Sequence, residues 1–455
     1  MTTSANWRRP PVGIVRVERS LCVEFEKLYG ERFRCCIWRD GTFLEWSLQS
    51  IAPQIAPLSA TAEESELQAV PANLPMMFSL LPRRHAAAAV AQGLLSLMPA
   101  NLRPFLNRIL HGLRPRVEQF LRLPRVSRWL ARTDQPVATA VVPPSRKRPA
   151  LFSPGDVLIS VGLDWGYDFY KAFYFLRKEH QVRVVTCCYD LIPVIYPQYC
   201  VGEVAGIFTS YFLDIADGSD LVLCISKQTE KDLLAMLDRT GGAKPKTHVF
   251  PLGDNVPVAS AEEISPAIRE ICKEPFILFV STIERRKNHE VLYRAYHLLC
   301  EEGKRDQLPK LLFVGMQGWG VGDLLKDIEL DPLTRELIVR LNHVTDAELR
   351  ALYDAAKFCA FPSLYEGWGL PVGEALSLGK AILSSNRGSL PEVGGDLVRY
   401  VDPWSPRAWA DEMYRMATDD AWRSEWEGKA KLQYVSRTWT DGALSVKDAI
   451  DPFLK

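Results

Sequence analysis

FPSLYEGWGLPVGEALSLG, the stretch from Phe361 to Gly379, decides the fold of this chain. An apolar run of strand length leads into a glycine-rich loop, and the loop leads into a helix. The backbone N–H groups of such a loop, and the N-terminus of the helix behind it, converge on one point and suit a phosphate. Glu366 and Glu374 flank the loop with seven residues between them. Their carboxylates can hold the hydroxyls of two sugars, one on either side of a diphosphate.

The same pattern of apolar runs and helix-length segments continues on both sides of this stretch. Short runs bounded by Gly, Asp and Ser are typical of buried parallel strands in a doubly wound α/β domain. One series lies at 156–161, 182–188 and 221–226, and a second at 276–281, 310–315, 337–341, 356–361 and 381–384. Two such series predict two Rossmann-like halves facing a central cleft, with ligands at the carboxyl ends of the strands. Upstream, 12–25 predicts a turn and a helix, and 33–46 predicts a hairpin.

Residues 53–150 interrupt this pattern. Pro, Ala and Ser dominate the ends of the segment, and its middle, 81–132, carries ten arginines against the single acid Glu118. Apolar residues at helical spacing separate the arginines. Short basic amphipathic helices of this kind can lie on an anionic membrane surface. The alternative is an insertion that packs on its own domain with a solvated basic face, and both interpretations stay open because prolines cut the pattern into short pieces.

The overall composition excludes some classes of function. Lys plus Arg and Asp plus Glu number 55 each, so no global basic field indicates nucleic-acid binding. The N-terminus lacks the pattern of a secretory signal, and no apolar run is long enough to span a bilayer. We therefore expect a cytoplasmic protein, with the inner face of the plasma membrane as an alternative. The ten cysteines form no C-x-x-C pair, which predicts free thiols.

Two further loops belong with the Gly-rich loop. STIERRKNH, from Ser281 to His289, follows an apolar run and places Arg286 and Lys287 where a helix begins. Cations at a helix start oppose its dipole, so they favour an anionic ligand such as a departing diphosphate. SSNRGSLPEVGGD, from Ser384 to Asp396, follows another run and begins a helix near its proline. All three loops are expected to converge on one site.

With these motifs, the sequence resembles the retaining GT-B glycosyltransferases of family 4 over roughly 150–445 and 12–18. The family's E-x7-E motif is matched by Glu366 and Glu374. By that resemblance, Glu366 would contact the 3- and 4-hydroxyls of the donor sugar, and Glu374 the ribose. Arg286 and Lys287 match the family's R-K pair, which implies contacts with the donor diphosphate. The segment 341–349 resembles the base-binding loop.

The resemblance implies catalytic roles for Glu366, Lys287, Arg286 and Asp190. It implies donor binding by Gly13, Thr282, Arg286, Lys287, His343, Val344, Glu366, Gly367, Trp368, Gly369, Leu370 and Glu374. In the N-terminal half, 188–197 matches the H-D-L-I-P-x-x-Y-P pattern of one branch, but Tyr189 replaces the histidine. What contacts the 6-hydroxyl of the transferred sugar, or the acceptor, therefore stays open.

The domain prediction follows from the same resemblance. Residues 1–258 would form an acceptor-side domain that contains the insertion at about 53–150, and 259–436 the nucleotide-sugar domain. Residues 437–455 would form a helix that returns to the first domain.

The expected activity is retaining, metal-independent transfer of a hexose. Mannose from GDP-mannose is preferred, because this branch includes bacterial enzymes of O-antigen and exopolysaccharide synthesis. In the family's usual account, the leaving phosphate takes the acceptor proton. The expected acceptor is a saccharide, favoured as polyprenyl-lipid-linked, and no cofactor is expected. Another GDP-, UDP- or dTDP-sugar, soluble disaccharide or glycogen-type synthesis, and a catalytically silent partner subunit are the alternatives.

Overall fold

The apolar runs of the C-terminal half form one parallel sheet in the computed structural model. Its strands are β7 (Phe276–Val280), β8 (Lys310–Val314), β9 (Ile338–Leu341), β10 (Phe358–Phe361), β11 (Ile382–Ser384) and β12 (Arg399–Tyr400). They are ordered β12-β11-β10-β7-β8-β9, so the strands that precede the Glu366 and Lys287 loops are direct neighbours at the centre of the sheet. Because every strand runs in the same direction, the loops after them lie at one edge.

The structure describes residues 1–6, 13–39, 41–47, 151–200, 202, 204–256 and 263–454. The predicted insertion at about 53–150, with its basic part 81–132, lies outside the described residues, and so does the predicted domain boundary at 258. The described residues on either side of that gap belong to one compact unit that contains both sheets.

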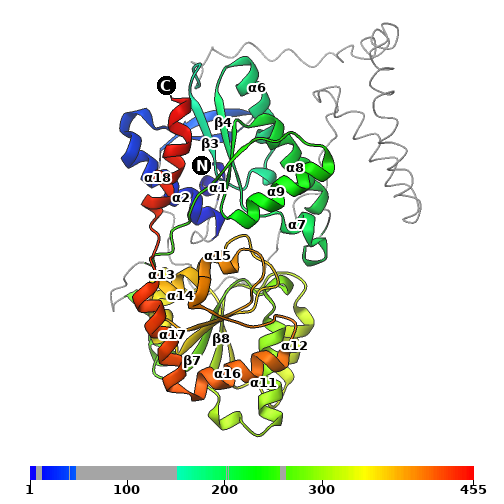
Figure 1. The fold of residues 1–455 in the computed structure, drawn as a ribbon, viewed down its shortest axis with the longest axis vertical. Coiled ribbons are helices and arrows are strands. Elements are labelled where there is room, and N and C mark those ends of the chain that lie inside the picture. The colour runs from blue at the N-terminus through cyan, green and yellow to red at the C-terminus, as the bar shows by residue number, and fades with distance from the viewer. Residues whose placement is uncertain are drawn as a thin grey trace, which may run out of the picture. The chain divides into compact units, whose positions relative to one another are not determined.

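Helices connect the strands of the C-terminal sheet, and Figure 1 shows α14 and α17 on one side of β7 and β8 and α11 and α12 on the other. The helices of this half are α10 (Pro266–Ile271), α11 (His289–Glu301), α12 (Gly322–Leu330), α13 (Asp346–Ala355), α14 (Leu370–Ser377), α15 (Leu390–Gly394), α16 (Pro406–Thr418) and α17 (Asp420–Gln433). The doubly wound α/β arrangement predicted for this half is therefore confirmed.

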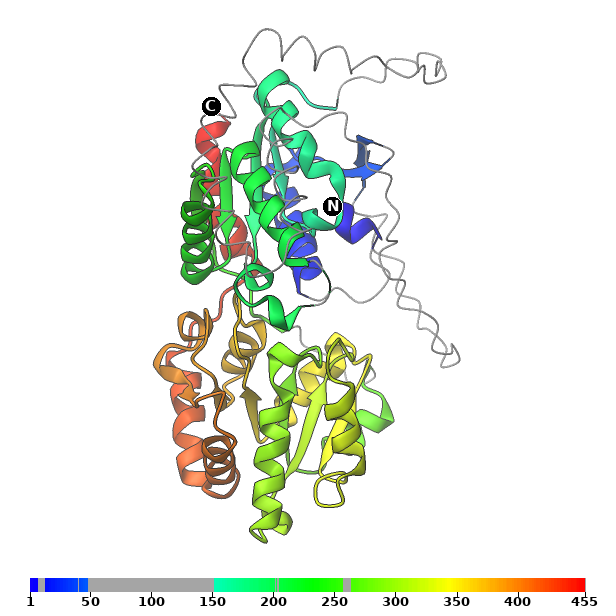
Figure 2. The ribbon, with the colours of Figure 1, turned by 90° about the vertical axis from the view of Figure 1, so that its right-hand side faces the viewer.

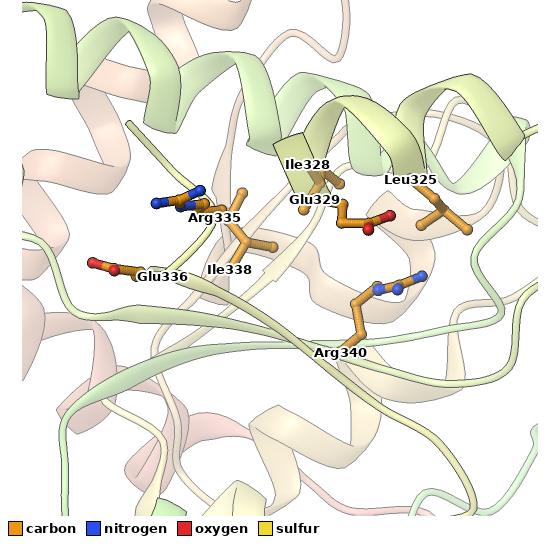
Figure 3. Close-up of a pocket in the computed structure, with 7 residues that line it drawn as sticks. All are labelled: Leu325, Ile328, Glu329, Arg335, Glu336, Ile338 and Arg340. Atoms are coloured by element: carbon orange, nitrogen blue, oxygen red, sulfur yellow. The ribbon is translucent and has the colours of Figure 1, made fainter. Parts of the chain in front are cut away.

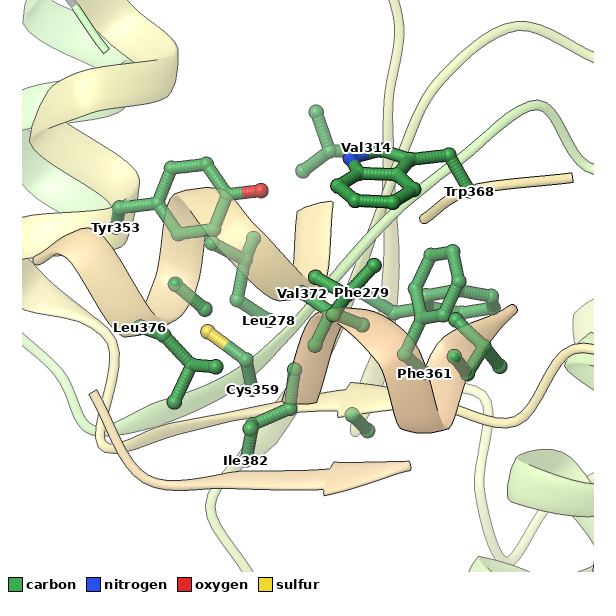
Figure 4. Packing of buried hydrophobic residues seen from close by; sticks show 14 of the residues in the cluster. Leu278, Phe279, Val314, Tyr353, Cys359, Phe361, Trp368, Val372, Leu376 and Ile382 are labelled. Carbon is green, nitrogen blue, oxygen red and sulfur yellow. The ribbon is translucent and has the colours of Figure 1, made fainter. Parts of the chain in front are cut away.

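The core of this half lies between the sheet and its helices. Val372 and Leu376, one helical turn apart on α14, face strand residues that include Leu278 and Ile382, as Figure 4 shows. All four side chains are at most 1% exposed. Burial of this stripe fixes the rotation of α14 about its axis. It thereby fixes the direction in which Glu374, on the same helix, presents its carboxylate.

The N-terminal half carries a second parallel sheet, in the order β3-β4-β5-β6. Its strands are β3 (Val157–Ser160), β4 (Arg183–Cys188), β5 (Leu221–Cys224) and β6 (Lys246–Val249), and its helices are α1 (Thr2–Asn6), α2 (Ile14–Tyr29), α6 (Phe173–Glu179), α7 (Ile192–Ile195), α8 (Val204–Gly218) and α9 (Lys227–Thr240). The predicted hairpin is also present, as the antiparallel pair β1 (Cys35–Arg39) and β2 (Thr42–Trp46). Both Rossmann-like halves of the predicted fold are thus observed, and all ten cysteines are free.

The last helix, α18 (Trp439–Ile450), packs against α2 in the N-terminal half. Thr440 Oγ1 donates to Glu24 Oε2 at 2.9 Å, and Tyr29 Oη donates to Asp451 Oδ1 at 3.2 Å just beyond the end of α18. Figure 2 shows the red C-terminal helix beside the sheet of the N-terminal half. The chain therefore crosses between the halves twice, at 251–256 and again at 434–438.

Candidate functional site

Glu366 is the centre of a buried group of charges in the loop between β10 and α14. Its side chain is 8% exposed. Oε1 accepts a hydrogen bond from Lys287 Nζ at 2.6 Å, and Oε2 lies 2.8 Å from Arg286 Nη1. Arg286 also donates through Nη2 to Glu284 Oε1 at 2.6 Å. Two cations and two carboxylates therefore form one continuous chain of ion pairs.

A short turn after β7 places the two cations. Arg285–Lys287 form one turn of 3-10 helix, and Asn288 follows with a φ of 62°, in the left-handed region that asparagine tolerates. The Asn288 side-chain amide donates to the carbonyl oxygens of Pro362 at 3.2 Å and Pro403 at 2.8 Å. These contacts fix the loop after β7 against the loops after β10 and β12.

Burial and ion pairing shift the pKa values of these side chains in opposite directions. Burial favours the neutral form of Glu366, but the charges of Arg286 and Lys287 outweigh it and lower the pKa of the carboxyl to about 2. Burial, followed by the charge of Arg286, lowers the pKa of the Lys287 ammonium. A phosphate near Lys287 would act in the opposite sense and favour its charged form, so this environment favours an anionic ligand.

Asp190, from the N-terminal half, lies beside these charges. It follows β4, and its Oδ1 accepts a hydrogen bond from Ile192 N at 3.0 Å. Burial raises the pKa of its carboxyl, and the charge of Arg286 opposes that rise. Gly367 allows the close approach of the two halves, because a Cβ there would overlap the Tyr189 carbonyl oxygen and lie 2.9 Å from Asp190 Cβ. The structure thus brings Asp190, Arg286, Lys287 and Glu366 together.

The first turn of α9 makes further contacts with the loops of the C-terminal half. Thr229 Oγ1 lies 3.2 Å from the Gly367 carbonyl oxygen. The backbone N–H groups of Lys227 and Gln228 donate to Glu392 at 2.8 and 2.7 Å. A carboxylate at a helix N-terminus is favoured by the helix dipole and by the unpaired N–H groups there. Glu392 on α15 therefore caps a helix of the other half.

The loop after β11 holds the Glu366 loop from another side. Gly388 has a φ of 60°, and a Cβ at this position would overlap the Glu366 carbonyl oxygen. Ser389 N donates to the same oxygen at 3.1 Å, and Ser389 Oγ lies 2.8 Å from the Trp368 carbonyl oxygen. Gly388 and Ser389 are thus explained by the close packing of two loops.

Glu374 makes a different set of contacts from Glu366. It lies within α14 and is 3% exposed. Oε1 accepts from Arg16 Nη1 at 2.8 Å, and Oε2 accepts from Tyr353 Oη at 2.9 Å. Burial raises the pKa of the Glu374 carboxyl, and Arg16 opposes the rise. The two glutamates of the motif therefore have separate partners.

The other predicted donor-binding residues lie at the ends of strands or of helices. Thr282 follows β7 and is exposed, while His343, with a φ of 57°, and Val344 follow β9. These segments share the edge of the sheet that carries Glu366. Gly13, with a φ of 50°, precedes α2, and Gly369, with a φ of 117°, precedes Leu370 at the start of α14.

The indole of Trp368 belongs to the core rather than to an open surface. It is 8% exposed and packs above Phe361 and Val372 in Figure 4. The Arg437 guanidinium lies 5.4 Å from the centre of its ring. Any contact of this residue with a donor would therefore come from its backbone.

Three residues that pair with the predicted ones were not identified from the sequence. Glu284 pairs with Arg286, and Tyr353 and Arg16 pair with Glu374. Arg16 had a usable signal, because a cation in the first turn of a helix opposes the dipole and needs an anion. The same physical reason predicts an anionic partner for Arg286 and Lys287. Tyr353 offered no such signal, since an aromatic residue at helical spacing is typical of a core position.

A hollow of about 420 Å³ lies away from these residues, between α12 and β9. Leu325, Ile328 and Ile338 form its apolar part, and Glu329, Arg335, Glu336 and Arg340 carry charges around it (Figure 3). None of the predicted site residues lines it.

Within the described ranges, no helix is both long and apolar enough to cross a membrane. The same residues contain no group of three or more His, Cys, Asp or Glu that could hold a metal, and metal-independent transfer stays a prediction.

Comparison with protein families matches residues 260–433 to the family described as Glycosyl transferases group 1. The O-antigen chain mannosyltransferase B of Escherichia coli is 28% identical over 302 residues, which cover 65% of this chain and 78% of that protein. A serotype-specific mannosyltransferase WbdA, also from E. coli, is 30% identical over 267 residues, or 57% of this chain and 32% of that protein. The match therefore spans about a third of that relative's length.

Among solved structures, a sucrose-phosphate synthase from Thermosynechococcus elongatus is similar with a TM-score of 0.49 and 20% sequence identity. The similarity covers 65% of this chain and 73% of that one.

Proposed function

We propose that this chain is a glycosyltransferase of the GT-B type, with its group 1 domain in the C-terminal half, and that it transfers mannose from GDP-mannose to a saccharide acceptor with retention at the anomeric carbon. The observation that carries the proposal is the buried group of Lys287, Arg286 and Glu366, with Glu374 on the following helix. The mannosyltransferase relatives support mannose as the sugar. The O-antigen role of one relative supports cell-surface polysaccharide synthesis as the process.

The cations supply the electrostatic part of the reaction. Lys287 and Arg286 are paired with Glu366 at 2.6 and 2.8 Å, so they are already desolvated and oriented before a substrate binds. When the bond between sugar and diphosphate breaks, negative charge grows on the leaving oxygen. Fixed cations in a buried site stabilise that charge without reorganising solvent. The leaving phosphate then takes the proton of the acceptor hydroxyl, so the reaction needs no side-chain nucleophile.

Glu366 fits a role in sugar orientation. Its carboxylate is ionised at neutral pH, because its pKa is about 2, and each oxygen retains lone pairs beyond those used by the cations. Hydroxyls of the transferred sugar can donate to these lone pairs. Asp190, close to the cations on the N-terminal side, fits the acceptor-facing part of the site.

The decisive experiment is a donor-turnover assay. Purified chain is supplied with GDP-mannose, UDP-glucose, UDP-galactose or dTDP-rhamnose, with and without extracted lipid-linked acceptors, and release of the nucleoside diphosphate is measured. We expect turnover of GDP-mannose that increases when the lipid-linked acceptor is added. Turnover of another donor would replace mannose in the proposal, and no turnover of any donor would indicate a silent partner subunit.

Two lysine variants link the activity to the site. Lys287→Met should lower kcat by about a hundredfold or more, as expected for loss of a cation aimed at developing charge. Lys380→Met is the matched control, because Lys380 is also half-buried in the C-terminal half but donates to the Asp354 and Ala356 carbonyl oxygens at 2.6 and 3.1 Å. Equal loss of kcat in both variants would contradict a specific role for Lys287.

The stereochemistry, the metal requirement and the membrane contact are tested separately. NMR of the isolated product should show the α-anomer of the donor retained, and EDTA should leave the rate unchanged. Removal of residues 81–132 should reduce sedimentation of the protein with anionic vesicles. Unchanged sedimentation would favour the alternative, an insertion that packs on its own domain.

A further inference from the structure

Arg16 lies in the first turn of α2, three residues after Gly13 and far in sequence from the loops that carry Lys287 and Glu366. A cation there is disfavoured by the helix dipole unless an anion is close. Its Nη1 donates to Glu374 Oε1 at 2.8 Å, and its Nη2 donates to the Asn255 carbonyl oxygen at 3.2 Å. The Arg16 side chain is 17% exposed and that of Glu374 4%. The ion pair therefore joins the N-terminal half to α14 of the C-terminal half.

The arginine head group is held on several sides. The Trp439 ring lies 6.0 Å from its guanidinium carbon. Asn255 belongs to the first crossing between the halves, and Trp439 begins α18 after the second. The guanidinium thus contacts the first crossing segment and the motif glutamate, and it faces the first residue of α18. A contact of this kind is broken if the halves separate.

The Glu374 carboxylate has one donor on each oxygen. Tyr353 Oη donates to Oε2 and Arg16 to Oε1, so the plane of the carboxylate is fixed from two directions. An ionised carboxylate can accept about four hydrogen bonds, so two positions are left for further donors. Two neighbouring hydroxyls, such as the 2′- and 3′-hydroxyls of a ribose, match that capacity.

We propose that Arg16 is a donor-positioning residue, which holds the Glu374 carboxylate from the opposite half in the orientation that the ribose of the donor nucleotide requires. This inference rests on the proposed function, because it needs a nucleotide donor at Glu374. Nucleotide affinity then depends on a contact between the two halves. Arg16 acts through Glu374 in this proposal, so it is a positioning residue and not a catalytic one.

Removal of Arg16 changes both the geometry and the charge of the site. The groups that face Glu374 are Arg16 from α2, Tyr353 and Asp346 from α13, and Cys359 from β10. Burial already raises the pKa of Glu374, and Arg16 is the cation that opposes the rise. Without it, the glutamate binds a proton more readily as the pH falls, and a protonated carboxyl accepts the ribose less well.

The test is calorimetric titration of the full chain with GDP and with GDP-mannose between about pH 6 and pH 8. Arg16→Met should weaken both ligands by about tenfold to a hundredfold, the range expected for a lost charge-assisted contact. The loss should be larger at the acidic end and equal for both ligands, because the ribose and not the mannose is affected. Arg16→Lys should restore part of the affinity.

Arg423→Met is the matched control. The Arg423 side chain is 14% exposed, close to the 17% of Arg16, and it pairs at 2.6 Å with the exposed side chain of Asp420 on α17. It should keep wild-type affinity within about twofold, since surface pairs contribute little. Glu374→Gln should weaken binding without the pH dependence, and adding Arg16→Met to it should cost little more, because the two residues act as one unit.

The outcomes separate the two claims. Wild-type affinity and a flat pH profile for Arg16→Met, in a chain that binds GDP, overturn the inference and leave the proposed function intact. A wild-type chain that binds neither GDP nor GDP-mannose overturns both. A loss of affinity in Arg423→Met equal to that in Arg16→Met would show general destabilisation and would also overturn the inference.

Discussion

His289 provides a quantitative test of the structure around the Lys287 turn. It begins α11 directly after the Lys287 turn and is 1% exposed. Its ring lies 4.3 Å from the Phe279 ring and 4.7 Å from the Phe313 ring, measured between centres. Nε2 lies 3.4 Å from Ser281 Oγ, while Nδ1 has no hydrogen-bond partner among the described residues. A charged imidazole has almost nothing to stabilise it there.

The resulting pKa shift has a defined effect on stability. Burial, followed by the charge of Lys287, lowers the pKa of His289 from 6.5 to about 3. A lowered folded-state pKa means that the unfolded chain binds the proton more tightly. The stability contributed by neutral His289 is therefore present above pH 6.5 and is lost as the pH falls from 6.5 toward 3. At roughly 1.4 kcal/mol per pH unit, the loss at about pH 5 is about 2 kcal/mol.

The assay is urea denaturation at about pH 7.5 and pH 5, followed by circular dichroism. His289→Phe keeps an aromatic ring between Phe279 and Phe313 but cannot titrate. When the pH falls from about 7.5 to about 5, the unfolding free energy of this variant should decrease by about 2 kcal/mol less than that of the wild type. Comparison within each variant cancels any change in packing caused by the substitution itself. An equal pH dependence for variant and wild type would refute the buried neutral histidine.

His297 on α11 is a control of opposite sign. Its Nδ1 lies 2.9 Å from Asp331 Oδ2, and that hydrogen bond raises the pKa of the imidazole. The stability that His297 contributes to the fold is therefore fully present below pH 6.5 and is lost as the pH rises through the folded-state pKa. His297→Gln should remove a pH dependence of that direction and leave the His289 effect unchanged.

Three further predictions concern packing and loop geometry. Gly388→Ala should lower Tm and weaken GDP binding in a thermal-shift titration, because its φ is 60° and its Cβ would overlap the Glu366 carbonyl oxygen. Leu376→Ala, in the α14 core, should lower the urea unfolding free energy by about 2–5 kcal/mol. Asp254→Ala should lower it by about 2 kcal/mol or more, because this carboxylate accepts from Ser436 Oγ at 2.6 Å and Arg437 N at 3.1 Å where the two crossing segments meet.

The strands that sequence reasoning identified share one physical property. Parallel strands covered by helices on both faces need near-continuous apolar runs, and each of the eight runs predicted here corresponds to a strand in the described residues. The two missed strands lack that signal. β6 lies at an edge of its sheet and reads Lys-Thr-His-Val, and β12 is a two-residue edge strand. Position at an edge is not the whole reason, since the edge strands β3 and β9 carry apolar runs and were predicted.

The site was accessible to prediction only in part. The three loops of the candidate site follow parallel strands, so their shared edge could be inferred from strand direction. The pairing of Arg16 with Glu374 joins residues 358 positions apart, and no periodicity relates them. The contacts of Glu392 with α9 are similar, since they depend on how one half meets the other. Long-range charge pairing thus needed the three-dimensional structure.

Tyr189, the departure from the family pattern, illustrates how the structure reassigns a residue. Its side chain is 4% exposed, and its hydroxyl donates to the Val161 carbonyl oxygen at 2.5 Å, just beyond the end of β3. The ring therefore stabilises the N-terminal sheet, and the residue meets the C-terminal half through its carbonyl oxygen, which adjoins Gly367. We therefore expect any side-chain contact with a transferred sugar to come from a neighbour. Asp190 is within electrostatic range of Arg286, Glu366 and Lys287, so it is the residue whose substitution should separate donor hydrolysis from transfer.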